Sequence, residues 1–431
     1  MYIPNTVLEL MDRLEDAGFE CHVVGGCVRD WLMGLQPHDY DCCTCATPEQ
    51  MQAVFADRQL VLAGLKHGTV SVVTEEGLVE ITTFRTEGGY ADARHPDWVR
   101  FVRNLSEDLA RRDFTVNAMA YSPRRGLSDP FGGHADMKKG ILRAVGDANC
   151  RFREDALRIL RGLRFAARFG FKIEDKTRQA MIDEIAGLDA LARERVMTEL
   201  TGFLLAAKAE DLLNAAPFLC RVIPELAPTV GFRQHNRHHI HDVFGHTARV
   251  VEAAPATAEL RLAALFHDIG KPAVFTLDES GEGHFFGHAA VSAQLADEIL
   301  HRLKASTALR EEVNFLVKHH MDRYPAEEKI ARRLLSRHGL GRMERLLELQ
   351  TADMGGEPDG EPEALRSLLR TLAEKEGSLT LKTLAVSGRD LLELGVAPGP
   401  QMGRILNGLL EKVLAGELPN DREALLAAVL S

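Results

Sequence analysis

The period of the hydrophobic positions changes near residue 150 of the chain. Up to about Val145 the apolar runs are short, as in HVV, TVSVVT, LVEITTF and ILRAVG, and turn residues separate them. Runs of this kind predict strands with a few helices between them. The N-terminal segment MYIPNTVLELMDRLEDAG instead predicts an amphipathic helix. The first third of the chain is therefore expected to be a small α/β domain.

From Arg151 onward the pattern is helical. Long amphipathic segments such as FREDALRILRGLRFAARFGF and RVMTELTGFLLAAKAEDLLNAA predict helices. Stretches rich in Pro, Gly and acids, around Ala227–Gly231 and Met354–Leu365, indicate linkers. The expected fold class is an α/β (α+β) head followed by an all-α body. We expect four parts, which are residues 1–145, 146–225, 226–355 and 356–431.

Length and composition narrow the class of protein. A chain of 431 residues is long enough for two to four domains. No apolar run approaches the roughly 20 residues of a membrane span, and the N-terminal helix does not resemble a signal peptide, so we expect a soluble, cytoplasmic protein. The seven cysteines are odd in number and lack a second pair at zinc-ribbon spacing, which favours reduced, mostly buried thiols. The sequence makes no prediction about the oligomeric state.

The charge is unevenly distributed. A net charge of −11 argues against a protein that coats nucleic acid indiscriminately. Between Arg100 and Lys172, however, basic residues outnumber acidic ones about two to one. They recur at helical spacing, which favours a local phosphate-binding groove over a merely solvated face.

Two aspartates, Asp39 and Asp41, are separated by one residue in the segment HDYD. If residues 38–44 form a strand, both carboxylates project from one face, where like charges repel unless a cation lies between them. Mg²⁺ is often bound by one or two carboxylates together with substrate phosphates. Glu80, on the predicted strand LVEITTF, is either a third catalytic carboxylate on a neighbouring strand or a solubilising residue on an edge strand. A solvated turn is the alternative for the two aspartates.

A glycine pair precedes these acids. Gly25 and Gly26 follow the predicted strand HVV and precede the predicted helix VRDWLMG, so backbone amides can approach phosphates closely. Together with Arg29, they predict a triphosphate site beside the metal-binding acids.

Two further groups of polar residues suit the rest of a nucleotide. Arg111, Arg112 and Asp113 suit contacts with ribose and phosphate, and a surface salt bridge is the alternative. Asp155 and Arg158 lie three residues apart and so share a helix face. Such a pair can read cytosine and adenine, which both present an amino donor beside a ring-nitrogen acceptor, and can reject guanine and uracil. The alternative is an ordinary salt bridge within the helix.

In order and spacing, several segments resemble the class II CCA-adding tRNA nucleotidyltransferases. They are VGGCVRDWLMG with HDYD, KHGTVSVV, EITTFRTEGGYADARHP, EDLARRDFTVNAMA, DPFGG and RFREDALRILRGLRFAARFGF. The resemblance is strong over residues 20–200 and weaker near the C-terminus. It implies a head, neck, body and tail enzyme that adds C, C and A to the 3′ end of tRNA from CTP and ATP. It implies Mg²⁺ on Asp39 and Asp41, and nucleotide binding by Gly25, Gly26, Arg29, Arg112, Asp113, Asp155, Arg158, Arg161 and Arg164.

A loop distinguishes members of this family. Those that lack the flexible loop before the RRD motif stop after CC, whereas here the segment GGYADARHP supplies Tyr90, Asp92 and Arg94. The resemblance therefore favours an enzyme able to add the terminal A.

Histidines and acids on the apolar helices of the body form a second group. A lone histidine is usually a core or surface residue, but the adjacent pair His267 and Asp268, with His246 upstream and Asp353 downstream, suits a transition metal that activates water. These four residues resemble the ligands of the HD phosphohydrolase domain. The resemblance implies a metal-dependent domain at 226–355 with phosphohydrolase activity. Some relatives with such a domain act on 2′,3′-cyclic nucleotides.

Other residues of this segment extend the possible ligand set. His288 and one of His319 and His320 resemble the additional ligands of binuclear HD domains, and Lys271 resembles a phosphate contact. His284 is a further candidate, so the sequence does not settle the set of metal ligands.

Two other functions are compatible with the motifs. One is an A-adding enzyme or poly(A) polymerase of the same superfamily, which incorporation from CTP would distinguish. The other is a nucleotide phosphohydrolase whose head only binds RNA, and the intact pair Asp39 and Asp41 argues against it.

Overall fold

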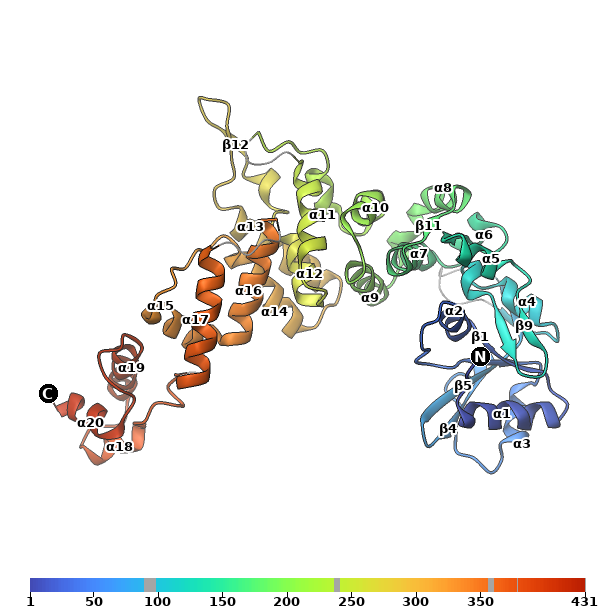
Figure 1. Cartoon of the computed structure of the whole chain (residues 1–431), viewed down its shortest axis with the longest axis horizontal. Helices are drawn as coiled ribbons and strands as arrows, with labels where there is room; N and C mark the ends of the chain where they lie inside the picture. The colour runs from blue at the N-terminus through green and yellow to red at the C-terminus, as the bar shows by residue number, and fades with distance from the viewer. Residues whose placement is uncertain (89–97, 236–240, 356–359, 378, 431) are drawn as a thin grey trace. The chain divides into compact units, whose positions relative to one another are not determined.

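The computed structural model of the chain describes residues 1–88, 98–235, 241–355, 360–377 and 379–430 (Figure 1). The chain forms two compact units, the first comprising Met1–Ala207 with Asn214–Pro224, and the second Lys208–Leu213 with Glu225–Ser431. Apart from residues 208–213 and 225, the predicted head and neck fall in the first unit, and the predicted metal-dependent domain and tail fall in the second. The finer division at residues 145 and 355 stays a prediction.

The first unit contains a mixed sheet of seven strands in the order β3-β4-β5-β2-β1-β8-β9. Its strands are β1 (Cys21–Val24), β2 (Cys42–Thr44), β3 (Leu60–Val61), β4 (Thr69–Thr74), β5 (Gly77–Thr83), β8 (Ala120–Ser122) and β9 (Gly126–Ser128). Only β2 and β5 pair in parallel; the other neighbours are antiparallel. Two smaller pairs are β6 (Arg85–Gly88) with β7 (Trp98–Phe101), and β10 (Ile141–Leu142) with β11 (Lys172–Ile173).

Helices cover this sheet and continue beyond it. The α-helices are α1 (Asn5–Asp16), α2 (Gly26–Leu32), α3 (Pro48–Val54), α4 (Leu105–Ala110), α5 (Gly133–Lys138), α6 (Ala148–Glu154), α7 (Leu157–Phe169), α8 (Asp175–Asp183), α9 (Arg193–Leu204) and α10 (Ala209–Val222). The 3-10 helices are η1 (Leu65–His67), η2 (Thr115–Asn117) and η3 (Ile185–Ala190). The sequence RVMTELTGFLLAAKAEDLLNAA therefore forms two helices, α9 and α10, rather than one.

Both faces of the central strands β1 and β2 are buried. Val23 and Cys42 belong to a core cluster with the apolar stripe of α1, while Val24 and Cys43 belong to a second cluster with α4. Successive residues of a strand point to opposite faces, which explains why HVV is continuously apolar instead of alternating. All seven cysteines are free thiols, as the sequence predicted.

Three local predictions need correction. The strand predicted over residues 38–44 begins only at Cys42, so Asp39 and Asp41 lie in the segment that leads into it. The segment FREDALRILRGLRFAARFGF forms α6 and α7 instead of one helix, and Asp155 lies at the break with extended backbone angles. Glu80 does not lie on an edge strand, since β5 pairs with both β4 and β2.

The second unit is mainly helical. Its elements are η4 (Pro224–Thr229), α11 (Val243–Ala253), α12 (Ala258–Phe266), η5 (Lys271–Ala273), β12 (Thr276–Leu277), β13 (Gly283–His284), α13 (His288–Arg302), α14 (Thr307–His319), α15 (Glu328–His338), α16 (Leu340–Asp353), α17 (Gly360–Glu376), α18 (Gly388–Glu393), α19 (Pro400–Leu414) and α20 (Arg422–Leu430). The predicted linkers overlap this structure, because η4 covers part of the first and α17 begins within the second. Among the described residues, no helix combines the length and apolar character needed to cross a membrane.

Candidate active site and metal centre

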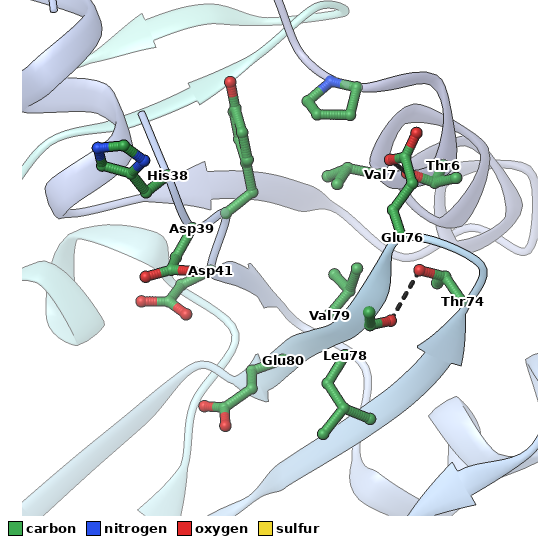
Figure 2. A pocket seen from close by; sticks show the side chains of 13 residues that line it. Thr6, Val7, His38, Asp39, Asp41, Thr74, Glu76, Leu78, Val79 and Glu80 are labelled. Carbon is green, nitrogen blue, oxygen red and sulfur yellow. Dashed lines mark hydrogen bonds between the residues drawn. The ribbon is translucent and has the colours of Figure 1, made fainter. Parts of the chain in front are cut away.

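A pocket of about 460 Å³ in the first unit contains the three acids expected to act together (Figure 2). Asp39 and Asp41 precede β2, and Glu80 lies on β5. Because Cys42 pairs with Ile81 in parallel register, Asp41 and Glu80 lie at the same level on neighbouring strands. Figure 2 shows the carboxylates of Asp39, Asp41 and Glu80 on one side of the pocket.

The electrostatics of this pocket favour a cation. Asp41 is exposed, yet its pKa is raised, first by partial desolvation and then by the charge of Glu80, with a smaller contribution from Asp39. Arg112 opposes this rise. The crowded carboxylates are hard oxygen ligands of the kind that Mg²⁺ prefers.

The glycine turn brings Arg112 close to these acids. Gly25 has a φ of 79°, and a Cβ atom built on it would lie 2.8 Å from Arg112 Nη1. A glycine is therefore required both by the backbone conformation and by the approach of the guanidinium group. Arg112 Nη2 lies 3.6 Å from Asp108 Oδ2, and its Nε is buried and makes no hydrogen bond within the described part of the chain.

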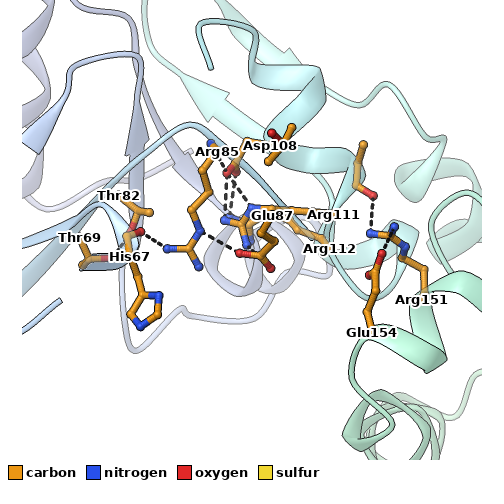
Figure 3. A network of polar contacts seen from close by, with 12 residues as sticks. His67, Thr69, Thr82, Arg85, Glu87, Asp108, Arg111, Arg112, Arg151 and Glu154 are labelled. Atoms are coloured by element: carbon orange, nitrogen blue, oxygen red, sulfur yellow. Dashed lines mark hydrogen bonds and ion pairs between the residues drawn. The ribbon is translucent and has the colours of Figure 1, made fainter. Parts of the chain in front are cut away.

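The neighbouring residue Arg111 pairs with the same carboxylate. Arg111 donates from Nε and Nη2 to Asp108 Oδ1, at 3.0 and 2.9 Å, and pairs with Glu87 at 3.5 Å. Figure 3 shows this network with Arg112 beside it. Asp108 is almost fully buried, so Arg111 forms a buried ion pair rather than the surface salt bridge considered from the sequence.

Arg29 lies in the interior of the first unit. It donates to Asp30 Oδ1 at 2.8 and 2.6 Å and to Asn117 Oδ1 at 2.6 Å. Its guanidinium group also lies 4.5 Å from the centroid of the Phe169 ring, and burial lowers its pKa. These contacts anchor α2 against α7, and the predicted contact of Arg29 with a triphosphate stays a prediction.

Asp113 is also engaged by protein groups. Its Oδ1 accepts from Phe114 N and Asn117 Nδ2, and its Oδ2 accepts from Arg161 Nε and Nη2 at 2.9 and 2.8 Å. The pKa of Asp113 is lowered, because Arg161 and these hydrogen bonds outweigh desolvation. In this structure Asp113 orients Arg161, and its predicted ribose contact is untested.

Asp155 and Arg158 do not pair with each other. Asp155 accepts from Arg195 Nη2 at 2.8 Å, whereas Arg158 donates to Glu154 Oε2 at 2.7 Å and to the carbonyl oxygen of Arg111 at 3.0 Å. The salt bridge considered as the alternative for this pair is therefore absent. The two side chains keep separate partners beside the N-terminal end of α7.

The second unit brings together six of the predicted metal-ligating residues. His246 Nε2 lies 2.9 Å from Asp353 Oδ1, and His267 Nε2 lies 3.1 Å from Asp268 Oδ2. These residues come from α11, the C-terminal end of α12, and α16. Two overlapping groups have their ligand atoms close enough to hold an ion, namely His246, His267 and Asp268, and Asp268, His288 and His320.

The histidines of this cluster are oriented as ligands. His267, His288 and His320 each place Nδ1 within 2.6–2.8 Å of a backbone carbonyl three residues earlier. A proton on Nδ1 leaves the Nε2 lone pair free to bind a metal. His288 Nε2 and His320 Nε2 are 3.2 Å apart, so both point into the same small volume.

The buried acids of this cluster attract positive charge. Burial disfavours charge on His267, yet Asp268 and Asp353 outweigh it and raise its pKa to about 10. Burial lowers the pKa of His320 to about 4. Buried acids that draw a proton onto one histidine, beside a neutral second histidine, form a donor set that a divalent cation would satisfy.

Three residues named from the sequence, Lys271, His319 and His284, have partners near or outside the cluster. Lys271 Nζ lies 2.7 Å from Asp268 Oδ2 and donates to Gln234 Oε1 at 2.9 Å. His319 was one of the two alternatives for a ligand, but its Nδ1 lies 2.7 Å from Asp322 Oδ2, outside the cluster. His284 pairs with Asp278 on the β12–β13 hairpin and is likewise not a member. Of the two adjacent histidines, His320 is the one that lies in the cluster, because adjacent residues of a helix face different directions.

Tyr90, Asp92 and Arg94, which the sequence analysis named, lie outside the described residues. Two polar residues that contact the predicted site residues were not found from the sequence. Asn117, which bridges Arg29 and Asp113, was missed although it is a polar residue within the apolar run TVNAMA. Arg195 was missed because nothing in a sequence links residues 40 positions apart.

Comparison with known proteins assigns the class. The model of the "Poly A polymerase head domain" matches residues 21–143, which contain the acid pocket and the glycine turn. The model described as "Probable RNA and SrmB- binding site of polymerase A" matches residues 170–228, and a model for tRNA nucleotidyltransferase domain 2 matches residues 284–429. The first unit therefore carries a nucleotidyltransferase head.

Similarity over the whole chain identifies the family. The CCA-adding enzyme of Limosilactobacillus fermentum is 34% identical, with 97% of this chain and 94% of that protein covered. The CCA-adding enzyme of Streptococcus thermophilus is 34% identical over 99% of this chain and 98% of its own length. The chain belongs to the CCA-adding enzymes, which are tRNA nucleotidyltransferases.

Solved structures agree with this assignment. The Bacillus stearothermophilus CCA-adding enzyme in complex with CTP has a TM-score of 0.74 and 30% identity, and the match covers 100% of this chain and 98% of that one. The Thermotoga maritima CCA-adding enzyme complexed with tRNA has a TM-score of 0.57 and 21% identity, over 100% of this chain and 97% of that one, and shows the fold alone.

Proposed function

We propose that the first unit adds C, C and A to the 3′ end of tRNA from CTP and ATP, without a nucleic-acid template, and releases pyrophosphate. The observation that carries this proposal is the convergence of Asp39, Asp41 and Glu80 in one pocket beside Arg112. Relatives named CCA-adding enzyme span almost the whole chain, and one solved relative is in complex with CTP. A tRNA substrate fits the cytoplasmic location expected from the sequence.

The acid pocket fits Mg²⁺. Asp39 and Asp41 would hold the ion, and Glu80 offers a third carboxylate at the level of Asp41. When bound there, Mg²⁺ supplies charge for the triphosphate and lowers the pKa of an attacking hydroxyl. By fixing the position of that ion, Asp39 and Asp41 would also fix the α-phosphate relative to the tRNA 3′ hydroxyl. Arg112, held over Gly25, would contact phosphate oxygens through its guanidinium group.

The base would be chosen by protein side chains. Asp155 would accept from the amino group shared by cytosine and adenine, and Arg158 would donate to the adjacent ring nitrogen. Arg161 and Arg164 follow at three-residue intervals on α7. They extend this basic face toward the phosphates, consistent with the local excess of positive charge.

The test is a 3′-end assay. The purified protein and Mg²⁺ are incubated with a tRNA transcript that ends at the discriminator base, and CTP alone, ATP alone or both are supplied. Two C residues with CTP, and CCA with both nucleotides, are expected at nucleotide resolution. Addition of A alone would contradict the proposal and indicate the A-adding alternative, and no addition would favour the hydrolase alternative.

We also propose that the second unit binds a divalent transition metal and hydrolyses phosphate esters. His246, His267, Asp268 and Asp353 would hold the ion, with His288 and His320 available for a second one. A metal at this position activates water for attack on phosphorus. Lys271, whose ammonium group is buried beside Asp268, would contact a phosphate oxygen.

This second proposal is tested with the metal and a simple ester. Purified protein loaded with Mn²⁺, Co²⁺, Ni²⁺ or Zn²⁺ is assayed for metal content by mass spectrometry and for hydrolysis of bis(p-nitrophenyl) phosphate. At least one metal should bind and support turnover. His319→Ala is the matched control and should keep both properties, because His319 pairs with Asp322 outside the cluster. Absence of binding and turnover with every metal would refute the proposal.

A further inference from the structure

Helix α9 supplies partners for three of the four predicted nucleotide residues on and beside α7. Arg195 donates from Nη2 to Asp155 Oδ2 at 2.8 Å, and its Nη1 lies 3.4 Å from Asp155 Oδ1. One turn later, Glu199 Oε2 accepts from Arg164 Nε at 2.6 Å, and Glu199 Oε1 lies 3.8 Å from Arg161 Nη1. The orientation of these side chains therefore depends on a helix outside the predicted nucleotide site.

Asp155 depends most on this helix. It lies between α6 and α7 with extended backbone angles, so no regular helix geometry fixes its side chain. Apart from Arg195, its carboxylate accepts only from Leu157 N, at 3.1 Å, among the contacts of the described chain. Arg158, by contrast, is held by Glu154 and by two backbone carbonyls. Removal of one side chain, Arg195, would thus release one half of the base-reading pair.

The contacts on Asp155 leave a defined direction for a ligand. Each carboxylate oxygen has two lone pairs. Leu157 N–H and the Arg195 fork occupy lone pairs on both oxygens, so the carboxylate plane is fixed and the remaining lone pairs keep one orientation. A freely rotating carboxylate would lose this orientation and with it the preference for a base with an amino donor at one place.

We infer that Arg195 is a positioning residue for base selection, which holds the carboxylate of Asp155 in the orientation that accepts the amino group of cytosine or adenine. The inference rests on the proposed role of Asp155 as a base-reading side chain. Arg195 itself need not contact the nucleotide. Its effect should therefore appear in the discrimination between nucleotides rather than in the rate alone.

The experiment measures kcat and KM for CTP and for UTP at the first addition, with a tRNA transcript that ends at the discriminator base. In Arg195→Ala and Arg195→Gln, the ratio of kcat/KM for CTP to that for UTP should fall about tenfold or more, as expected for loss of an oriented base contact. The KM for CTP should rise. Arg195→Lys should restore part of the ratio, because an ammonium group can donate to one oxygen of Asp155.

Arg193→Ala is the matched control. Arg193 lies in the same turn of α9, and its side chain donates only to the carbonyl oxygen of Asp189, at 3.4 Å, among the described contacts. This variant should keep the wild-type ratio. If the role of Arg195 were only structural, Arg195→Gln would lower kcat for both nucleotides and the stability of the unit while the ratio stayed at its wild-type value, and that result would overturn the inference.

The variant Asp155→Asn distinguishes a failure of the role of Arg195 from a failure of base reading by Asp155. A fall in its CTP-to-UTP ratio, together with an unchanged ratio in both neutral Arg195 variants, would overturn the role of Arg195 and leave base reading by Asp155 intact. An unchanged ratio in Asp155→Asn would instead overturn the proposed base-reading pair. If Arg195→Ala does not fold, Arg195→Gln, which keeps most of the side-chain length, decides the question.

Discussion

At the scale of single residues, three carboxylates meet in the acid pocket. Asp39 and Asp41 were expected to share a face because they lie two positions apart in a strand, but that strand begins only at Cys42. They still line one pocket with Glu80, and the contact with β1 continues before β2, because Val24 N donates to Asp41 O at 2.9 Å. The spacing of the two aspartates therefore predicted that they lie together, even though β2 is shorter than predicted.

Replacement of either aspartate by alanine tests this pocket. Asp39→Ala and Asp41→Ala should each reduce CCA addition about a thousandfold or more, because a divalent ion contributes several kcal/mol to such a reaction. The measurement is the rate of the first C addition at saturating CTP, with tRNA affinity measured separately and expected to change little. His38→Ala, from the same pocket but without a carboxylate, should remain active. Retained turnover in both aspartate variants would exclude them as metal ligands.

At the scale of elements, packing of α5 against η2 positions the segment that carries Asn117 and follows Asp113. Gly133 begins α5, and a Cβ atom at this position would lie 2.1 Å from the carbonyl oxygen of Thr115. Thr115 belongs to η2, and its hydroxyl donates to Asp136 on α5 at 2.8 Å. Because the obstacle is backbone, it cannot rotate away as a side chain would. This close approach explains the second glycine of the DPFGG motif, Gly133.

Gly133→Ala should destabilise the first unit by about 2 kcal/mol or more, the scale of an overpacked core position. Both tryptophans, Trp31 and Trp98, belong to the first unit, so urea unfolding followed by tryptophan fluorescence reports that unit. Its midpoint should fall in Gly133→Ala. Gly408→Ala, on α19 of the second unit with no atom within 4 Å of the added Cβ, should leave the midpoint unchanged. An unaltered midpoint in Gly133→Ala would show that the contact is relieved by a backbone shift.

At the scale of the whole molecule, the two sets of acids belong to different compact units. The acid pocket lies in the first unit and the His–Asp cluster in the second. Each site draws its residues from its own unit.

His267→Ala tests this independence. Loss of a ligand from the centre of the cluster should abolish metal binding, measured by mass spectrometry after dialysis, and hydrolysis of bis(p-nitrophenyl) phosphate. CCA addition should stay within about twofold of the wild-type rate, as expected for sites without shared partners. A parallel loss of CCA addition and of folded protein would show that the cluster is needed for the stability of the chain instead.

The sequence by itself determined the elements and residues whose signal is local. The apolar runs predicted the N-terminal helix and the strands β1, β4 and β5, and the ordered motifs were sufficient for the family. The residues that meet in both sites, such as Asp41 with Arg112 and His246 with Asp353, were also named from their types and motifs. Side-chain alternation and helical periodicity act over a few residues, which is why they are readable without a fold.

Only the tertiary structure decided which partner each charged side chain takes. Asp155 pairs with Arg195 rather than Arg158, Asp113 holds Arg161, and His320 rather than His319 enters the metal cluster. Sequence spacing gives the direction of a side chain on its own element, but it does not give the element that packs opposite. The break between α6 and α7 and the position of β5 inside the sheet depend in the same way on long-range packing, because tertiary contacts override local propensity.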